Sequence, residues 1–338
     1  MPRSANALRW TGQAGHYEVY YVTLNDPETG LGVWIRYTML SPLPGSGQEP
    51  SCALWFAVMD PAPRAQEPVL ARKASFPIDR LAARGEPFRL DLAGASLMDG
   101  AMAGGLEDAW WDLKWRPAAN AHRPVHPALE RLGLAQTVLA VPHADVAIDG
   151  SVGFGQRRIE FAGARGGQAH LWGTKHANSW TWARCSDLVN SDGNPVSETF
   201  FDGVSALVER FGRQIGPNTP MVGRLAGREL RSTSPLRILS NRSRFDVDGW
   251  EFEARGPSLK VLGAVSVRRE QLAGVTYHDP DGQEAYCYNS ETASVKLEVY
   301  ERRGGVGWTH AGTLASADRC HFEYAQRTPV PGLELMLR

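Results

Sequence analysis

The stretch HYEVYYVTL-NDPETGL-GVWIRYTML, residues 16–40, decides the fold class of this chain. Side chains in residues 16–24 alternate between two faces, with Glu18, Tyr20, Val22 and Leu24 on one and Tyr17, Val19 and Tyr21 on the other. Residues 32–40 repeat this period of two, which is typical of a β-strand. The Asn, Asp, Pro and Gly residues between the two segments favour a tight turn. The stretch therefore predicts a β-hairpin.

Similar segments recur along the whole chain. Ala53–Met59 is apolar on both faces, as expected of a strand covered on both sides. The spacing of the further segments, roughly 8–12 residues, favours an all-β sandwich or barrel. These predicted strands are Ala109–Trp115, Asp145–Phe154, Arg157–Phe161, Ala169–Trp172, Ser179–Asp187, Thr199–Val208, Gly223–Arg231, Leu236–Arg242, Trp250–Ala254, Leu259–Val267, Gly274–His278, Ala285–Tyr288, Ser294–Arg302, Trp308–Leu314 and Cys320–Ala325. Only Ile78–Arg84 and His126–Leu132 are predicted as short helices, and Arg116–His126 as a loop.

The chain of 338 residues has the length of about two domains. The polar stretch Ser186–Ser197 separates two β-rich halves of similar length. We therefore predict an N-terminal β domain at 1–190 and a C-terminal β domain at 191–338, which lie side by side.

Charge and composition exclude several classes of protein. There are 36 Lys and Arg against 37 Asp and Glu, so the basic surplus that a nucleic acid requires is absent. No apolar run reaches the length of an integral membrane segment. The opening residues MPRSANALRWTG lack the apolar region of a signal peptide, so a cytoplasmic location is predicted. The sequence leaves the oligomeric state open.

Motifs for cofactors and metals are also absent. There is no phosphate-binding loop, no G-x-S-x-G elbow, no H-E-x-x-H and no dinucleotide-binding fingerprint. The pair His122 and His126 has no nearby thiolate or carboxylate to complete a metal site. We therefore predict no cofactor and no metal.

Two clusters rich in aromatic residues remain as candidate sites. In residues 106–115, Trp111 shares one strand face with Leu113 and Trp115. Residues 166–185, GGQAHLWGTKHANSWTWARC, place His, Lys and Asn between tryptophans, and buried polar side chains there need partners. A tryptophan stripe also suits an ordinary core, so the alternative of a structural role stays open.

Our candidates for a proton-handling role are His170, Asp108 and Lys175. An imidazole beside Trp172 in a glycine-flanked strand could exchange a proton near neutral pH, with Asp108 or Glu107 reaching its second nitrogen. The predicted lining of a hydrophobic pocket consists of Tyr37, Trp111, Trp172, Trp180 and Trp182. Of these, Trp180 and Trp182 are predicted to be buried, on a strand that closes the first half.

Residues 166–185 resemble a stretch of the AttH-like and hydroxyneurosporene-synthase-like (carotenoid 1,2-hydratase) proteins. The segments GHYEVYY (15–21), WIRY (34–37) and YCYNSE (286–291) are similar to the same family. The resemblance extends over nearly the whole chain. It implies two lipocalin-like (calycin) β-barrels or sandwiches, and a family that includes cofactor-free hydration, cyclisation and plain lipid binding.

Three functions are compatible with these observations. The first is a cofactor-independent cyclase, isomerase or hydratase that acts on a hydrophobic isoprenoid or polyketide substrate in an aromatic-lined pocket. The second is a non-catalytic carrier of a lipid or terpenoid, which needs the cavity but no proton donor. The third is a structural or immunity-type β protein without any ligand. Fold alone does not choose among them.

Overall fold

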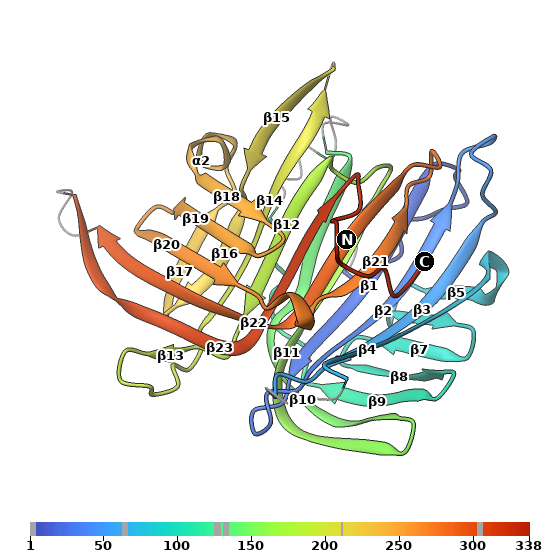
Figure 1. Ribbon diagram of the computed structural model, residues 1–338, viewed down its shortest axis with the longest axis horizontal. Coiled ribbons are helices and arrows are strands. Elements are labelled where there is room, and N and C mark those ends of the chain that lie inside the picture. Colours follow the sequence, from blue (N-terminus) through green and yellow to red (C-terminus); the bar gives the residue numbers. More distant parts are fainter. Residues whose placement is uncertain (1–4, 63–66, 125–129, 131–134, 211, 303–306) are drawn as a thin grey trace.

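The computed structural model describes residues 5–62, 67–124, 130, 135–210, 212–302 and 307–338. Within these ranges, two antiparallel sheets lie side by side, each curled around its own apolar core (Figure 1). The helical segments α2 (Pro235–Ser240), η1 (Ile78–Arg80) and η2 (Arg269–Gln271) are all short. The prediction of an all-β fold with two barrel-like halves and few short helices is confirmed.

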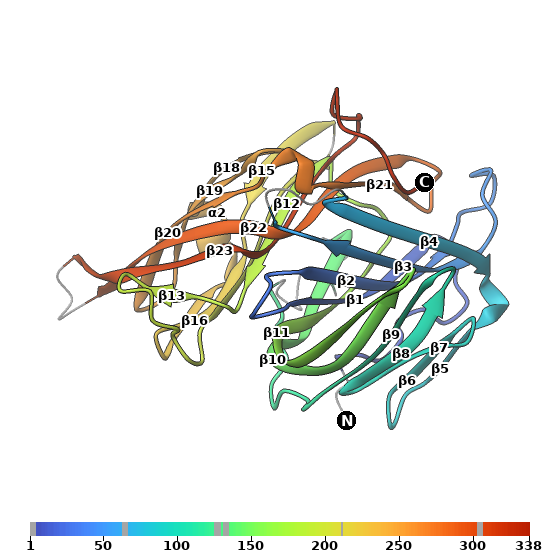
Figure 2. The ribbon, with the colours of Figure 1, turned by 60° about the horizontal axis from the view of Figure 1, so that its bottom comes forward.

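The first sheet has eleven strands. Figure 2 shows it folded back on itself, with β5–β9 beneath β2–β4, so that the two arms enclose one core. In spatial order the strands are β4 (Val69–Pro77), β3 (Ser51–Met59), β2 (Gly32–Ser41), β1 (His16–Asn25), β11 (Arg157–Gly173), β10 (Thr137–Phe154), β9 (Ala109–Trp115), β8 (Ala101–Leu106), β7 (Ala95–Met98), β6 (Arg89–Leu92) and β5 (Leu81–Arg84).

The second sheet has twelve strands and is also curled, because its edge strand β17 contacts β19 and β20. Its main path runs β17 (Arg228–Ser232), β16 (Met221–Leu225), β14 (Phe200–Arg210), β12 (Ser179–Cys185), β23 (Trp308–Gln326), β22 (Glu284–Arg302), β20 (Leu259–Ser266), β19 (Gly249–Arg255) and β18 (Arg242–Asp246). Off this path, β13 (Val189–Asn190) pairs with β23, β15 (Arg213–Asn218) with β14, and β21 (Ala273–His278) with β22.

The predicted hairpin is present as β1 and β2, and its alternation divides the two faces of the first sheet. Tyr20, Val22 and Ile35 point into the core of that sheet. Tyr21 and Trp34 point the other way and pack against the second sheet. Both faces of β1 are therefore buried, one inside the half-barrel and one between the halves.

The contact between the sheets is a third apolar cluster, to which Tyr21, Trp55, Trp180, Trp182 and Val275 belong. A charged side chain also crosses it. Arg184 of β12 donates to Thr23 Oγ1 at 2.6 Å and to the Ala144 carbonyl at 2.5 Å. A Cβ at Gly167 would lie 1.9 Å from Arg184 Nη2, so only glycine leaves room for it there.

The chain passes from one sheet to the other between the end of β11 at Gly173 and the start of β12 at Ser179. Trp180 and Trp182 therefore lie in the second sheet, and the expectation that their strand closes the first half is wrong. The division into domains at residue 190 stays a prediction. The linker Thr174–Asn178 matters below, because it carries Lys175 and His176.

Several predicted elements differ from the structure. Pairs of short predicted strands are single long strands, as in β11, β22 and β23. Gly223–Arg231 is the hairpin β16–β17, and residues 236–240 of the predicted strand Leu236–Arg242 belong to α2. Ile78–Arg84 is one 3-10 turn followed by β5. The predicted helix His126–Leu132 lies, except for Glu130, outside the described residues. In the part described, we find no helix with the length and apolarity needed to cross a membrane.

Candidate active site

A cavity of about 550 Å³ lies between the two sheets. One wall consists of the outer face of β1–β4 with parts of β10 and β11, and the other of β12, β14, β15, β21, β23 and α2. Most lining side chains are apolar, with a few ionisable groups among them: Arg36, Lys73, Lys175, His176, His278 and Glu323. An apolar cavity of this size with a few polar groups at a junction between two units is typical of a ligand site.

His176 of the linker is held at the cavity wall by a buried carboxylate. Its Nδ1 lies 2.6 Å from Asp279 Oδ1, and its backbone N–H donates to the same oxygen at 2.9 Å. Arg327 donates from Nη1 to Asp279 Oδ2 at 2.6 Å and from Nη2 to the His176 carbonyl at 2.5 Å. One arginine thus fixes both members of the pair.

Asp279 has the charge that this role requires. Burial would raise the pKa of its carboxyl, but the hydrogen bonds from His176 and the nearby positive charge of Arg327 outweigh burial and lower it below the usual value. An ionised Asp279 accepts the Nδ1 proton, and the ring then presents Nε2 for chemistry.

Aromatic rings surround this imidazole. It stacks on Tyr17 at 4.2 Å between ring centroids, on Trp180 at 5.3 Å and on Tyr277 at 5.5 Å. Its side chain is 13% exposed, and within the described residues no hydrogen-bond partner is found for its Nε2. The Tyr277 hydroxyl is likewise buried without a partner in that part of the chain. The site therefore offers one oriented imidazole nitrogen and one phenol hydroxyl to a ligand.

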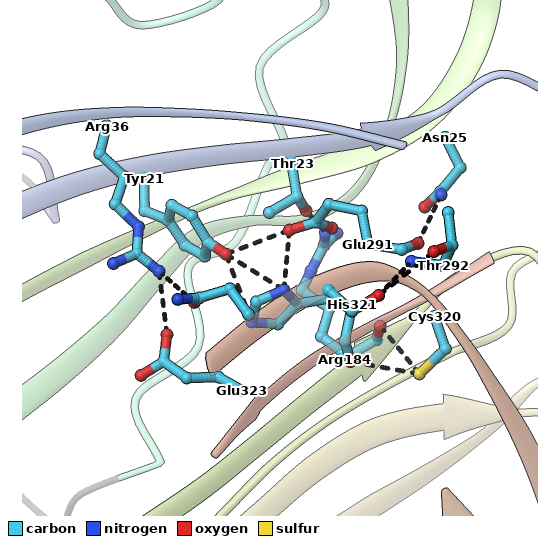
Figure 3. Close-up of polar contacts among 12 residues, drawn as sticks. Tyr21, Thr23, Asn25, Arg36, Arg184, Glu291, Thr292, Cys320, His321 and Glu323 are labelled. Carbon is cyan, nitrogen blue, oxygen red and sulfur yellow. Dashed lines mark hydrogen bonds and ion pairs between the residues drawn. The ribbon is translucent and has the colours of Figure 1, made fainter. Parts of the chain in front are cut away.

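Charged side chains from both sheets form a buried part of the cavity wall, which we call the floor, and Figure 3 shows the polar contacts of Arg36 and Glu323 there. Arg36 of β2 donates from Nη2 to Glu323 Oε2 of β23 at 2.9 Å and to Asn289 Oδ1 at 2.7 Å. Trp180 Nε1 donates to Glu323 Oε1 at 2.5 Å. The guanidinium lies 4.2 Å from the ring centroid of Tyr21. These contacts fix the angle of Trp180, and with it the stack on His176.

The same floor continues away from the cavity (Figure 3). The Tyr21 hydroxyl donates to Glu291 Oε1 at 3.1 Å, and His321 Nδ1 lies 2.8 Å from that oxygen. Burial raises the pKa of Tyr21 well above its ordinary value, and the charge of Glu291 adds to this, so the phenol stays protonated and donates. Because Tyr21 is in the first sheet and its partners in the second, the network ties the two sheets together.

Lys73 provides a further cationic group on the cavity wall. Its Nζ lies 4.2 Å from the ring centroid of Trp55 and donates to the Arg338 carbonyl at 2.8 Å. Burial lowers its pKa to about 8. This ammonium can therefore lose its proton more readily than an exposed lysine.

Three of the predicted site residues line this cavity, namely Lys175, Trp180 and Trp182. Lys175 Nζ is paired with Asp281 Oδ2 at 2.8 Å. Trp180 is 8% exposed and Trp182 is 3% exposed, so their predicted burial is confirmed.

His170 lies on the opposite face of the first sheet, away from the cavity. Its ring is fully buried and stacks on Tyr20 at 4.2 Å. Nδ1 lies 2.7 Å from the Ala5 carbonyl, and Nε2 lies 2.7 Å from Glu18 Oε1. Glu18 therefore takes the position that we predicted for Asp108 or Glu107. Both ring nitrogens are occupied, and the catalytic role of His170 stays a prediction that this geometry does not support.

The other predicted residues do not line this cavity either. Asp108 is on the exposed turn between β8 and β9, where Arg72 Nε donates to its Oδ1 at 3.0 Å. Tyr37 and Trp111 belong to the inner core of the first sheet, and Trp111 Nε1 donates to the Tyr37 hydroxyl at 3.0 Å. Trp172 packs beside His170. Strand alternation explains these positions, because Tyr37 points inward when its neighbour Arg36 points toward the second sheet.

The sequence contained signals for the residues that were missed. His176 stands in the polar segment TKHANS, directly after the predicted Lys175, and Asp279 opens the DPDG turn. Both features are visible in the sequence, but the two segments lie 103 positions apart, and nothing local indicates that they meet.

The pH dependence of stability tests the buried cluster around Glu18. Burial would raise the pKa of Glu18, but hydrogen bonds from His16, His170 and the Arg9 backbone lower it from 4.5 to about 2. Because the pKa of Glu18 is lower in the folded protein than in the unfolded chain, its ionised form stabilises the fold at pH values above 4.5. This contribution is lost as the pH falls from 4.5 toward 2. We expect a loss of about 3 kcal/mol over this range.

Urea unfolding at about pH 5 and about pH 3 should detect about 2 kcal/mol of this loss, because the remainder appears only as the pH falls from 3 toward 2. In Glu18→Gln, the free energy of unfolding should change less between these two pH values, whatever the effect of the substitution on absolute stability. Glu298→Gln is the matched control, because Glu298 has a similarly lowered pKa of about 2 but its side chain is 28% exposed and is screened by solvent. If the free energy of unfolding of Glu18→Gln falls as much between these pH values as that of the unchanged protein, Glu18 is not the source of the pH dependence.

Within the described ranges, no group of three or more His, Cys, Asp or Glu side chains is arranged as metal ligands would be.

The fold defines the class of protein. The structure is similar to an AttH protein from Nitrosomonas europaea, with a TM-score of 0.57 and 14% identity over 95% of this chain and 100% of that one. It is also similar to kievitone hydratase from Nectria haematococca, with a TM-score of 0.52 and 9% identity over 93% of this chain and 89% of that one. The chain thus has the AttH-like, lipocalin-type fold.

Sequence similarity shows the family. Uncharacterized proteins of Mycobacterium tuberculosis, Rv0493c in strain H37Rv and MT0513 in strain CDC 1551, are 31% identical to this chain over 315 residues. The match covers 92% of this chain and 88% of each relative. The chain belongs to the family of these mycobacterial proteins. No protein-family model matches it.

Proposed function

We propose that the protein is a cofactor-independent enzyme of the hydratase type, which acts on a hydrophobic substrate in the cavity between the sheets. The observation that supports this most is the His176 imidazole, oriented by buried Asp279 and facing an apolar cavity with Nε2 free of partners among the described residues. One of the structures with this fold bears the name kievitone hydratase. A carrier would need the cavity but no such oriented proton donor.

In the reaction that we propose, protonated His176 gives its Nε2 proton to one carbon of a carbon–carbon double bond. Water adds to the adjacent carbon, and the proton that this water loses returns to the imidazole. One water is consumed and His176 is restored. Loss of a proton instead of water addition gives an isomer, and attack by a second double bond gives a cyclised product.

The neighbouring residues suit a developing positive charge. The faces of Tyr17, Trp180 and Tyr277 can each stabilise a nearby cation by about 0.5–2 kcal/mol. Asp279 stabilises the imidazolium and keeps the ring oriented. The Tyr277 hydroxyl can donate to a substrate oxygen. Isoprenoids and unsaturated polyketides have the apolar skeleton, the double bonds and the size that this cavity accepts.

Incubation with isoprenoid and polyketide extracts in oxygen-18 water tests the proposal. We expect a product that has gained one water with the labelled oxygen. An isomeric product without label assigns isomerisation or cyclisation to the same site. Native mass spectrometry that finds a bound but unchanged ligand, with no product from either extract, would overturn the enzyme and favour the carrier.

A further inference from the structure

One end of the cavity opens at an apolar surface formed by β15 and α2, which contact each other. Ile215 of β15 and Leu239 of α2 line the cavity and are at the same time 42% and 66% exposed. Leu236, on the same short helix, is 83% exposed. Side chains that line a cavity and also face solvent mark its mouth. We call these three residues the apolar rim.

The chain around the apolar rim is strongly basic. Residues 209–244 contain eight arginines and two glutamates, an excess of six positive charges in a chain whose net charge is −1. Two of these arginines, Arg224 and Arg228, are paired with glutamates outside this stretch. Arg213 begins β15, and Arg237 lies between Leu236 and Leu239 on α2. For these two arginines, no ion pair with a carboxylate is found in the described part of the chain. Their charge is available to an external partner.

We propose that the apolar rim and its arginines dock on the surface of an anionic lipid membrane. Large apolar side chains next to arginines are what the boundary between headgroups and acyl chains accepts. Anionic lipids complement the excess of positive charge. A soluble acidic protein would complement the arginines but gives no reason for leucines at the mouth of an apolar cavity. A membrane explains both, because it is also the phase in which hydrophobic molecules accumulate.

The position of the rim gives the docking a consequence. Because Leu239 and Ile215 belong both to the rim and to the cavity wall, a molecule leaving the bilayer at this surface enters the cavity without crossing bulk water. The docking itself does not depend on the chemistry proposed above. It can be measured without any substrate, so its failure is distinguishable from failure of the proposed function.

Sedimentation of the full chain with vesicles tests the proposal. We expect binding to phosphatidylcholine vesicles that contain roughly a third phosphatidylglycerol, much weaker binding to pure phosphatidylcholine, and a fall as salt is raised. Each arginine near an anionic surface strengthens binding by roughly fivefold, so Arg213→Glu with Arg237→Glu should weaken it by at least about 25-fold. Leu236→Asp should weaken it by roughly tenfold or more.

Two controls keep this test specific. Arg158→Glu changes an exposed arginine on the distant β10–β11 hairpin and should leave vesicle binding unchanged. Light scattering reports whether the chain self-associates. If the chain binds neither kind of vesicle, the proposal is overturned. Binding that is as strong in Leu236→Asp as in the unchanged chain also overturns it. A dimer that Leu236→Asp converts to a monomer, without vesicle binding, would instead assign the rim to a second copy.

Discussion

His176→Gln is expected to lower turnover by about 10²–10⁴-fold while the melting temperature stays nearly unchanged. Asp279 holds the ring at the cavity wall, and in the variant this carboxylate still accepts from the backbone N–H of residue 176 and from Arg327. Glutamine retains a polar amide of similar reach, but it cannot accept and return a proton near neutral pH. Steady-state kinetics on the substrate identified with labelled water, together with thermal unfolding, measures both quantities.

Asp279→Asn should also lower turnover, because an uncharged amide no longer stabilises the protonated His176 ring that gives up its Nε2 proton. His310→Gln is the matched control, since His310 is half exposed and paired with Glu298 away from the cavity. His170→Gln separates the two histidines of the motif. It should lower stability and leave the turnover of the folded fraction intact. Full activity in His176→Gln, or a large loss in His310→Gln, would remove His176 from the mechanism.

Arg36→Met is expected to cost about 3–5 kcal/mol of unfolding free energy, because it leaves a carboxylate buried without its cation. Arg36 Nη2 lies 2.9 Å from Glu323 Oε2, and the two side chains are only 4% and 7% exposed. The substitution keeps the stacking volume over Tyr21 and removes the charge. Urea unfolding with two independent probes measures the change.

The double variant Arg36→Met with Glu323→Gln should recover much of this loss, since the orphaned charge is then absent. The exposed pair Arg89 and Asp91 is the control, with side chains 42% and 41% exposed. Arg89→Met should cost less than about 1 kcal/mol. A loss in Arg36→Met no larger than that of Arg89→Met, or additive effects in the double variant, would show that the floor does not hold the sheets together.

Sequence patterns were sufficient wherever a local period determined the structure. The alternation in residues 16–40 predicted the β1–β2 hairpin and separated Tyr20 and Ile35 on one face from Tyr21 and Trp34 on the other. The pattern failed for α2, because a short apolar run such as LRILS fits a strand or a helix equally well. It also divided β22 and β23, where polar residues such as Asn289 and Asp318 stand inside long strands.

The sequence by itself determined that this chain is all-β, that it has two curled halves, and that Trp180 and Trp182 are buried. Only the tertiary structure decided which face of each strand meets the cavity. Both faces of β1 are buried, so alternation cannot tell the half-barrel core of His170 from the junction between the sheets. The pairing of His176 with Asp279 depends on segments brought together by two separate sheets. Periodicity is a local property, and the site is made by long-range contacts.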